Sequence, residues 1–146
     1  MGASELKDVF NKRDWDWDSY QKFCFVRNPF DRVVSLFHHR SRSHKISFEN
    51  FVSDIDPENR VTTSLKSFLC DQNGDFLVND ILKFEELNDA LPKFLNKSGI
   101  SITTDDIPHL NASDDRLSYR DYYDDELKEK VKNLYEYEFE RFGYSF

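Results

Sequence analysis

Residues 23–35 constrain the fold of this chain more than any other segment. The run Phe23–Val26 combines aromatic and β-branched residues, which is typical of a short buried strand. Asn28 is a favourable helix N-cap, and Pro29 suits the first helical position because no backbone N–H is needed there. From Phe30 onward, apolar residues recur at i+3, i+4 and i+7, which marks one face of a helix. The segment therefore predicts a strand, a turn and a helix in immediate succession, as in an α/β fold.

The polar residues of this unit predict a phosphate site. Arg27 stands where the strand ends, and Ser35 falls about 140° from Phe30 on a helix that turns about 100° per residue. Ser35 and Arg32 are therefore expected on the exposed side of the helix. Ligands of open α/β sheets bind at the carboxyl ends of the strands. A guanidinium and a hydroxyl near a helix start can hold a phosphate.

The sequence V-R-N-P-F-D-R-V-V-S at residues 26–35 resembles the 3′-phosphate-binding motif of sulfotransferases that use 3′-phosphoadenosine 5′-phosphosulfate. It is most similar to the membrane-type carbohydrate sulfotransferases and their bacterial relatives. The resemblance implies that Arg27 and Ser35 hold the 3′-phosphate of this nucleotide, and of its product adenosine 3′,5′-bisphosphate. It also implies transfer of a sulfuryl group to a hydroxyl of a carbohydrate-type acceptor.

Three later segments continue the resemblance in the same order. They read I-L-K-F-E-E-L at 81–87, P-H-L-N-A-S at 108–113, and Y-R-D-Y-Y at 119–123 leading to F-E-R-F-G-Y at 139–144. The family's late loop closes over the nucleotide, which adds weaker binding candidates beside Arg32: Asn111, Ser113, Tyr119 and Arg120. The implied fold is that of the sulfotransferases, which resembles P-loop NTPases. We expect one domain over residues 1–146, helix-rich and α/β, with a small, mostly parallel sheet.

The second phosphate grip of the family is absent from this sequence. The 5′-phosphosulfate is normally held by a glycine-rich loop with a lysine and a Ser or Thr. Neither G-x-x-x-x-G-K-[ST] nor P-K-x-[GA]-[ST] occurs, and only 22 residues precede the first strand. We therefore expect an N-terminally truncated form with half of the nucleotide site. Whether it turns over substrate stays open.

No catalytic residue is assigned from the sequence. Some relatives place a histidine, acting as general base, upstream of the R-x-N-P strand, and no histidine precedes Arg27 here. The histidines of the chain are His38, His39, His44 and His109. His39 lies one turn beyond Ser35, and a surface histidine without a catalytic role is the interpretation we adopt. A non-catalytic interaction or regulatory module that retains the fold is the alternative function.

Charge and composition limit the classes of ligand and partner that this chain is expected to bind. The chain has 20 basic and 28 acidic residues, for a net charge of −8, which does not favour nucleic acid. Basic residues gather between 27 and 45, which suits an anionic nucleotide, although a solvated helix face is the plainer interpretation of such a run. The two cysteines show no metal-binding spacing, and no metal is expected.

No apolar stretch approaches the roughly 18 residues of a membrane span, and the N-terminus does not read as a signal peptide. We expect a cytoplasmic protein, or one of the Golgi lumen if the chain is a fragment of a membrane-anchored eukaryotic relative. A sheet that lacks its first strand has an unpaired edge. A homodimer or strand exchange is therefore expected.

The spacing of apolar residues, together with residues that cap or end helices, predicts the remaining helices and strands. Trp15 and Trp17 are interpreted as anchors of a loop on the core. Ser47 and Asp124 are expected to cap helices, and Gly99 to end one. The expected helices cover 4–12, 29–42, the segment after Ser47, 62–69, one from 85 or 87 to 97, and one from 125 to 139 or 142. The expected strands cover 23–26, 76–78 and 80–84.

Overall fold

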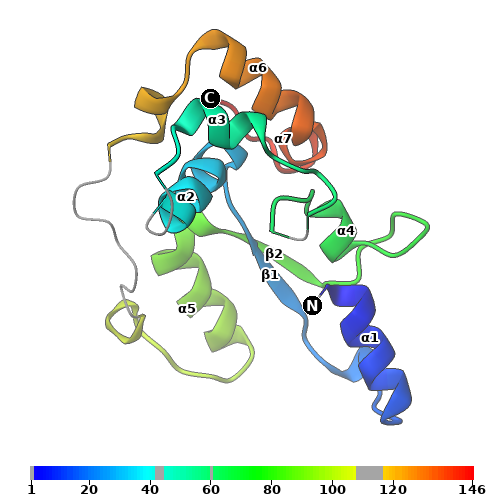
Figure 1. Cartoon of the computed structure of the whole chain (residues 1–146). Coiled ribbons are helices and arrows are strands. Elements are labelled where there is room, and N and C mark those ends of the chain that lie inside the picture. Colours follow the sequence, from blue (N-terminus) through cyan, green and yellow to red (C-terminus); the bar gives the residue numbers. More distant parts are fainter. Residues whose placement is uncertain (1, 42–44, 60, 108–116) are drawn as a thin grey trace.

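The computed structural model describes residues 2–41, 45–59, 61–107 and 117–146. At its centre lies a parallel pair of strands, β1 (Phe23–Val26) and β2 (Asp80–Lys83) (Figure 1). Phe23 lies opposite Asp80 and Val26 opposite Lys83, so the carboxyl ends of both strands reach the same edge. Parallel strands need a long crossover, and the helices between them supply it.

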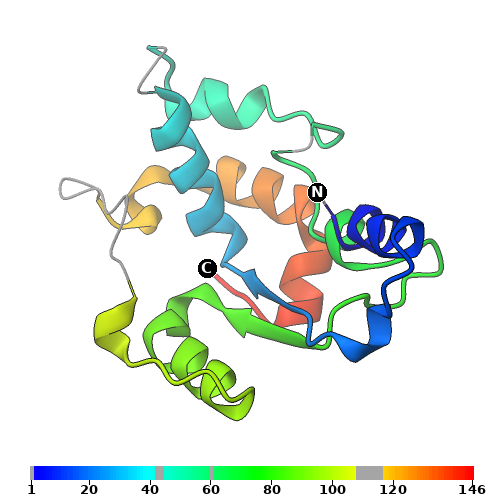
Figure 2. The same cartoon turned by 90° about the horizontal axis from the view of Figure 1, so that it is seen from below.

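Helices surround this small sheet. Figure 2 shows α5 on one side of the strand pair and α2, α6 and α7 on the other. The helices are α1 (Ala3–Lys12), α2 (Pro29–Ser41), α3 (Phe48–Ser53), α4 (Lys66–Leu69), α5 (Leu87–Lys97), α6 (Asp125–Leu134) and α7 (Glu136–Phe142), with 3₁₀ turns η1 (Trp17–Ser19), η2 (Phe84–Glu86), η3 (Thr104–Asp106) and η4 (Tyr119–Tyr122). The predicted helix-rich α/β fold with a small parallel sheet is confirmed. Within the described ranges, no helix has the length and apolar character to cross a membrane.

The main core forms where α2 meets α3 and α6. The predicted apolar face of α2 is confirmed, since Phe30, Val33 and Val34 are buried. The residues that pack against them are Phe51, Val52, Tyr123, Leu127, Val131 and Tyr135. Full burial of a valine contributes about 1.5–3 kcal/mol. The packing of α2 against α3 and α6 therefore fixes the direction in which α2 leaves the sheet.

The predicted helix ends are confirmed by their hydrogen bonds. The Ser47 hydroxyl accepts from the N–H of Asn50 at 3.2 Å, and the Asp124 carboxylate accepts from the N–H of Leu127 at 2.8 Å. Gly99 follows α5 with a φ of +81°, a left-handed conformation that glycine adopts without strain. These local signals therefore set the boundaries of α3, α5 and α6.

Tertiary contacts override the sequence pattern in three segments. The helix expected over 62–69 is limited to α4, because the preceding backbone bonds to α7 instead. The strand expected over 76–78 is reduced to a single bridge between Phe76 and Cys70. The long final helix breaks at Tyr135, whose buried hydroxyl donates to the carbonyl of Thr62 at 2.7 Å. The break turns α7 toward that segment.

Each strand of the two-stranded sheet has one edge without a strand partner among the described residues. Each of β1 and β2 has one strand neighbour within the described residues, and the Phe23 side chain is 38% exposed. Unpaired edges favour association. Self-association or strand exchange through this edge stays a prediction.

Candidate functional site

Arg27 leaves the sheet at the carboxyl end of β1 and is held on two sides. Its Nε lies 2.5 Å from Oδ2 of Asp31, which belongs to the first turn of α2. The guanidinium carbon lies 4.8 Å from the centroid of the Phe84 ring, which follows β2. The two Nη groups make no hydrogen bond within the described part of the chain. Arg27 therefore presents its bidentate edge while its plane is already oriented.

Asn28 locks the turn between β1 and α2. Its side-chain oxygen accepts from the N–H of Phe30 at 3.0 Å, which confirms its predicted role as a helix cap. Its amide nitrogen donates to the Ser145 carbonyl at 2.9 Å, and its backbone N–H donates to the Glu85 carboxylate at 2.6 Å. Glu85 belongs to η2, directly after β2. The two strand ends and the C-terminus are thus tied together at one point.

Ser35 shares a face of α2 with the residue that holds Arg27. Asp31 and Ser35 are four residues apart, so their side chains project from the same face, about one turn of 5.4 Å along the axis. Ser35 is half-buried. Arg27 and Ser35 consequently flank Asp31 along one side of the helix.

A pocket of about 270 Å³ opens beside this turn. Its lining residues are Asn28, Asp31, Glu85, Tyr119, Arg120, Gly143, Tyr144 and Ser145. The Arg120 guanidinium carbon lies 5.4 Å from the ring centroids of both Tyr119 and Phe146. Two of the weaker sequence candidates, Tyr119 and Arg120, are therefore brought to the turn. Asn111 and Ser113 lie outside the described residues.

The charges around the pocket are mixed. Arg27 and Arg120 supply positive charge, whereas Asp31 and Glu85 supply negative charge. The Tyr144 hydroxyl donates to Glu85 at 2.9 Å, and burial together with this hydrogen bond raises the pKa of Tyr144. Because both carboxylates already accept hydrogen bonds from the protein, an anion would compete chiefly with Asp31 for Arg27.

Arg32 differs from the expectation that it lies beside Ser35 on the exposed side. Its Nη2 lies 3.6 Å from the carboxylate of Glu138 and donates to the Thr63 carbonyl at 3.4 Å. Its guanidinium carbon lies 4.5 Å from the Tyr135 ring centroid. The attraction of a fully buried carboxylate draws Arg32 toward α7, away from Arg27.

Glu138 is the structural residue that the sequence interpretation missed. It is 0% exposed and accepts hydrogen bonds from the N–H of Leu65 at 2.7 Å and the hydroxyl of Ser64 at 3.1 Å. A signal was present, since a carboxylate recurs at helical spacing after Val131 and Tyr135, on an otherwise apolar face. Such a residue needs a buried partner.

The two histidines that belong to the described residues, His38 and His39, lie away from the turn between β1 and α2. His38 Nε2 lies 2.7 Å from the Tyr122 hydroxyl, and His39 is exposed on α2. His44 and His109 lie outside the described residues. Within the described chain, no group of three or more His, Cys, Asp or Glu side chains could hold a metal ion.

A sequence model described as "Sulfotransferase family" matches residues 4–145, from α1 to the residue that Asn28 holds at the C-terminus. No curated protein and no solved structure matches the chain.

Proposed function

The chain belongs to the sulfotransferase family, and on that premise we propose that it binds 3′-phosphoadenosine 5′-phosphosulfate, or the product adenosine 3′,5′-bisphosphate, through its 3′-phosphate. Arg27 and Ser35 are the proposed ligands of this phosphate. The proposed reaction class is sulfuryl transfer to a hydroxyl of a carbohydrate-type acceptor. The observation that carries the nucleotide proposal is the fixed guanidinium of Arg27, with both Nη groups free within the described chain.

The geometry of Arg27 favours a phosphate over a neutral group. A guanidinium with its two Nη groups available matches two phosphate oxygens at once. The contacts with Asp31 and Phe84 already restrict the arginine side chain, so less conformational entropy is lost when a ligand binds. Asp31 competes for the same cation, and a phosphate dianion competes with a carboxylate better than a neutral hydroxyl does. The site should therefore discriminate nucleotides by the presence of the 3′-phosphate.

Tyr119 and Arg120 are proposed to contact the same nucleotide. Arg120 is exposed at the pocket beside Asn28. Its guanidinium lies against aromatic rings and pairs with no carboxylate of the described residues, so its charge is available at the opening. Tyr119 offers an aromatic face at the same opening. An aromatic ring and an arginine suit a purine and a phosphate. Arg32 is given no direct contact, because Glu138 holds it.

Calorimetry with two nucleotides tests the proposal. Adenosine 3′,5′-bisphosphate should bind, and adenosine 5′-monophosphate should bind at least about tenfold more weakly because it lacks the group that Arg27 holds. Arg27→Ala should weaken bisphosphate binding by about ten- to a hundredfold, since a hydrogen bond to a charged group contributes about 1.5–3 kcal/mol. Ser35→Ala should weaken it by up to about tenfold.

Arg141→Ala is the matched control, because that exposed arginine also lies over a phenylalanine ring, Phe76, at 4.8 Å. Its affinity for the bisphosphate should equal that of the unmodified chain. Equal binding of both nucleotides, or binding of neither, would contradict the proposal.

A non-catalytic module is the second candidate function. The observation that favours it is the ion pair between Arg27 and Asp31, because a guanidinium that already has a counter-charge gains less from binding a phosphate. Transfer of labelled sulfate from the nucleotide to glycans separates the two functions. Bisphosphate binding without any transfer would favour the module, and measurable transfer would exclude it.

A further inference from the structure

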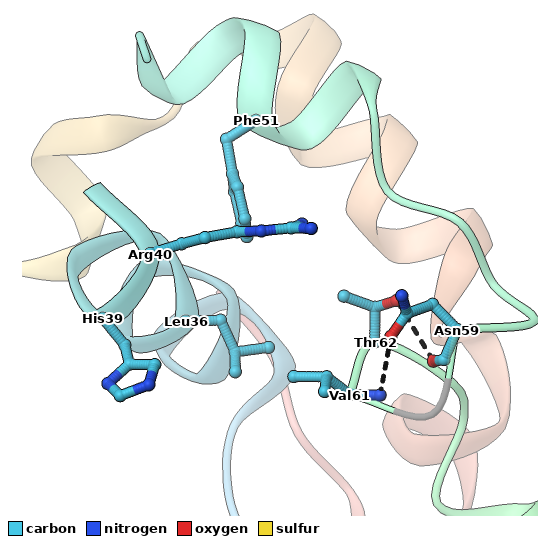
Figure 3. A pocket seen from close by; sticks show the side chains of 7 residues that line it. All are labelled: Leu36, His39, Arg40, Phe51, Asn59, Val61 and Thr62. Carbon is cyan, nitrogen blue, oxygen red and sulfur yellow. Dashed lines mark hydrogen bonds between the residues drawn. The ribbon is translucent and has the colours of Figure 1, made fainter. Parts of the chain in front are cut away.

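A second pocket lies farther along α2, with a volume of about 190 Å³ (Figure 3). It is formed by the C-terminal half of α2, by α3 and by the turn that follows α3. Its lining residues are Leu36, His39, Arg40, Phe51, Asn59, Val61 and Thr62. It shares none of these residues with the pocket beside Asn28.

The interior of this pocket is apolar. Leu36 and Val61 point toward one another, and Phe51 reaches down from α3 (Figure 3). Two polar wall atoms are already used, because the Asn59 side-chain oxygen accepts from the N–H of Val61 at 3.0 Å and the Thr62 hydroxyl donates to the Asp56 carbonyl at 2.5 Å. A ligand rich in hydroxyls would find few partners here, whereas an apolar ring would bury its surface.

Arg40 supplies the charge at the mouth of the pocket. Figure 3 shows its side chain running from α2 toward the turn that holds Thr62. Arg40 and its neighbour His39 are exposed and make no hydrogen bond or ion pair with the described residues. Among the described lining residues there is no carboxylate, although the whole chain carries a net charge of −8. An unpaired guanidinium beside an apolar cavity suits a ligand with one anionic group.

The far wall is held in place before any ligand arrives. The N–H of Thr62 donates to the Asn59 carbonyl at 2.9 Å, and the Thr62 carbonyl accepts from the Tyr135 hydroxyl at 2.7 Å. The next carbonyl, that of Thr63, accepts from Arg32 at 3.4 Å. These bonds join the turn to α2 and to the start of α7. Little ordering is left for a ligand to impose.

We propose that this pocket binds a small monoanion in which a carboxylate or a sulfate ester is attached to an apolar six-membered ring. The ring lies between Leu36, Phe51 and Val61, and the anionic group lies against Arg40. A cavity of about 150 Å³ is known to admit benzene, so the volume here admits one ring and its substituent. His39 lies eight residues after Asp31, about 12 Å along the helix. Neither Arg27 nor Ser35 lines this pocket, so the proposal does not rest on the nucleotide site, although His39 lies only one helical turn beyond Ser35.

Amide NMR titration of the full chain with three probes tests the proposal. Benzoate and phenyl sulfate carry the charge as a carboxylate and a sulfate ester, and benzamide is the neutral counterpart of benzoate. We expect one of the two anions, or both, to bind with a dissociation constant on the order of a millimolar, as suits a fragment of this size. Shifts should be confined to the C-terminal half of α2, α3 and residues 59–62. Benzamide should bind at least about tenfold more weakly.

Two variants assign the contacts. Arg40→Ala should weaken benzoate or phenyl sulfate about tenfold, and Val61→Ser should weaken both anions several-fold, because Val61 is 66% exposed and its loss leaves the core intact. Arg13→Ala is the control, since that exposed arginine lies over Trp15 instead. Equal affinity for benzamide, unchanged affinity in Arg40→Ala, or shifts centred on other elements would overturn the proposal.

Discussion

Replacement of Glu138 by alanine should remove a large share of the stability of this protein. The carboxylate is 0% exposed, accepts from Leu65 and Ser64, and faces Arg32 at 3.6 Å. Without it, two partly buried donors lose their acceptor and the Arg32 cation loses its counter-charge. Breaking a buried pair by removing one partner costs about 3–5 kcal/mol. We expect the free energy of unfolding to fall by about 4 kcal/mol.

That loss is readily measured by chemical and thermal unfolding. Domains of comparable size are stable by about 5–15 kcal/mol, so the variant should still fold. Its melting temperature should fall by roughly 8–16 °C, at about 2–4 °C per kcal/mol. Denaturation in urea, followed by circular dichroism, gives the same quantity through the midpoint. Glu140→Gln, an exposed position on the same helix, should change the free energy of unfolding by less than about 0.5 kcal/mol.

A double-mutant cycle identifies the partner of Glu138. Glu138→Gln retains an oxygen for Leu65 and removes the charge, and Arg32→Met retains much of the arginine's volume. The two losses should be coupled by about 1–2 kcal/mol, so the double variant should be more stable than the sum of the single losses predicts. Additive losses, or a cost below about 1 kcal/mol for Glu138→Ala, would refute the reasoning.

Two further predictions concern a helix cap and a half-buried thiol. Asp124→Ala should lower the free energy of unfolding by about 0.5–2 kcal/mol in urea denaturation, since Leu127 then lacks its acceptor; an unchanged midpoint would contradict the cap. Burial raises the pKa of the Cys24 thiol from 9.0 to about 11, so the folded chain disfavours the thiolate. The neutral thiol therefore adds to the free energy of unfolding below pH 9, and this contribution is lost as the pH rises toward 11. Cys24 should therefore resist a thiol-specific reagent at pH 8 in the folded chain and react after addition of urea, with Cys24→Ser identifying its share; fast labelling of the folded protein at Cys24 would contradict this.

The strand, the turn and the apolar face of α2 could be predicted from residues 23–35 alone. The same holds for the caps at Ser47 and Asp124 and for the end of α5. Each of these signals depends on residues within about one helical turn of one another, where sequence spacing fixes spatial proximity. The family could be predicted as well, because its motifs are short and occur in a fixed order.

The candidate site was predictable as a set of residues and less so as a geometry. Arg27 does stand at the strand end, and Tyr119 and Arg120 do reach the turn beside it. The contact of Arg27 with Phe84 and that of Asn28 with Glu85 could not be inferred, because the latter joins residues 57 apart in the sequence. The prediction that Arg32 lies on the exposed side of α2 was wrong for the same reason, because its partner Glu138 is distant in the sequence.

The sequence by itself determined the strand–turn–helix unit, its caps and the family of this protein. Only the tertiary structure decided which charges meet. Glu138 lies 74 residues from Ser64. Its burial redirects Arg32, shortens the start of the helix expected at 62–69 and helps to fix the wall of the second pocket. A buried charge is stable only beside compensating partners, and those partners are brought together by the packing of α2 against α6 and α7 rather than by any local pattern.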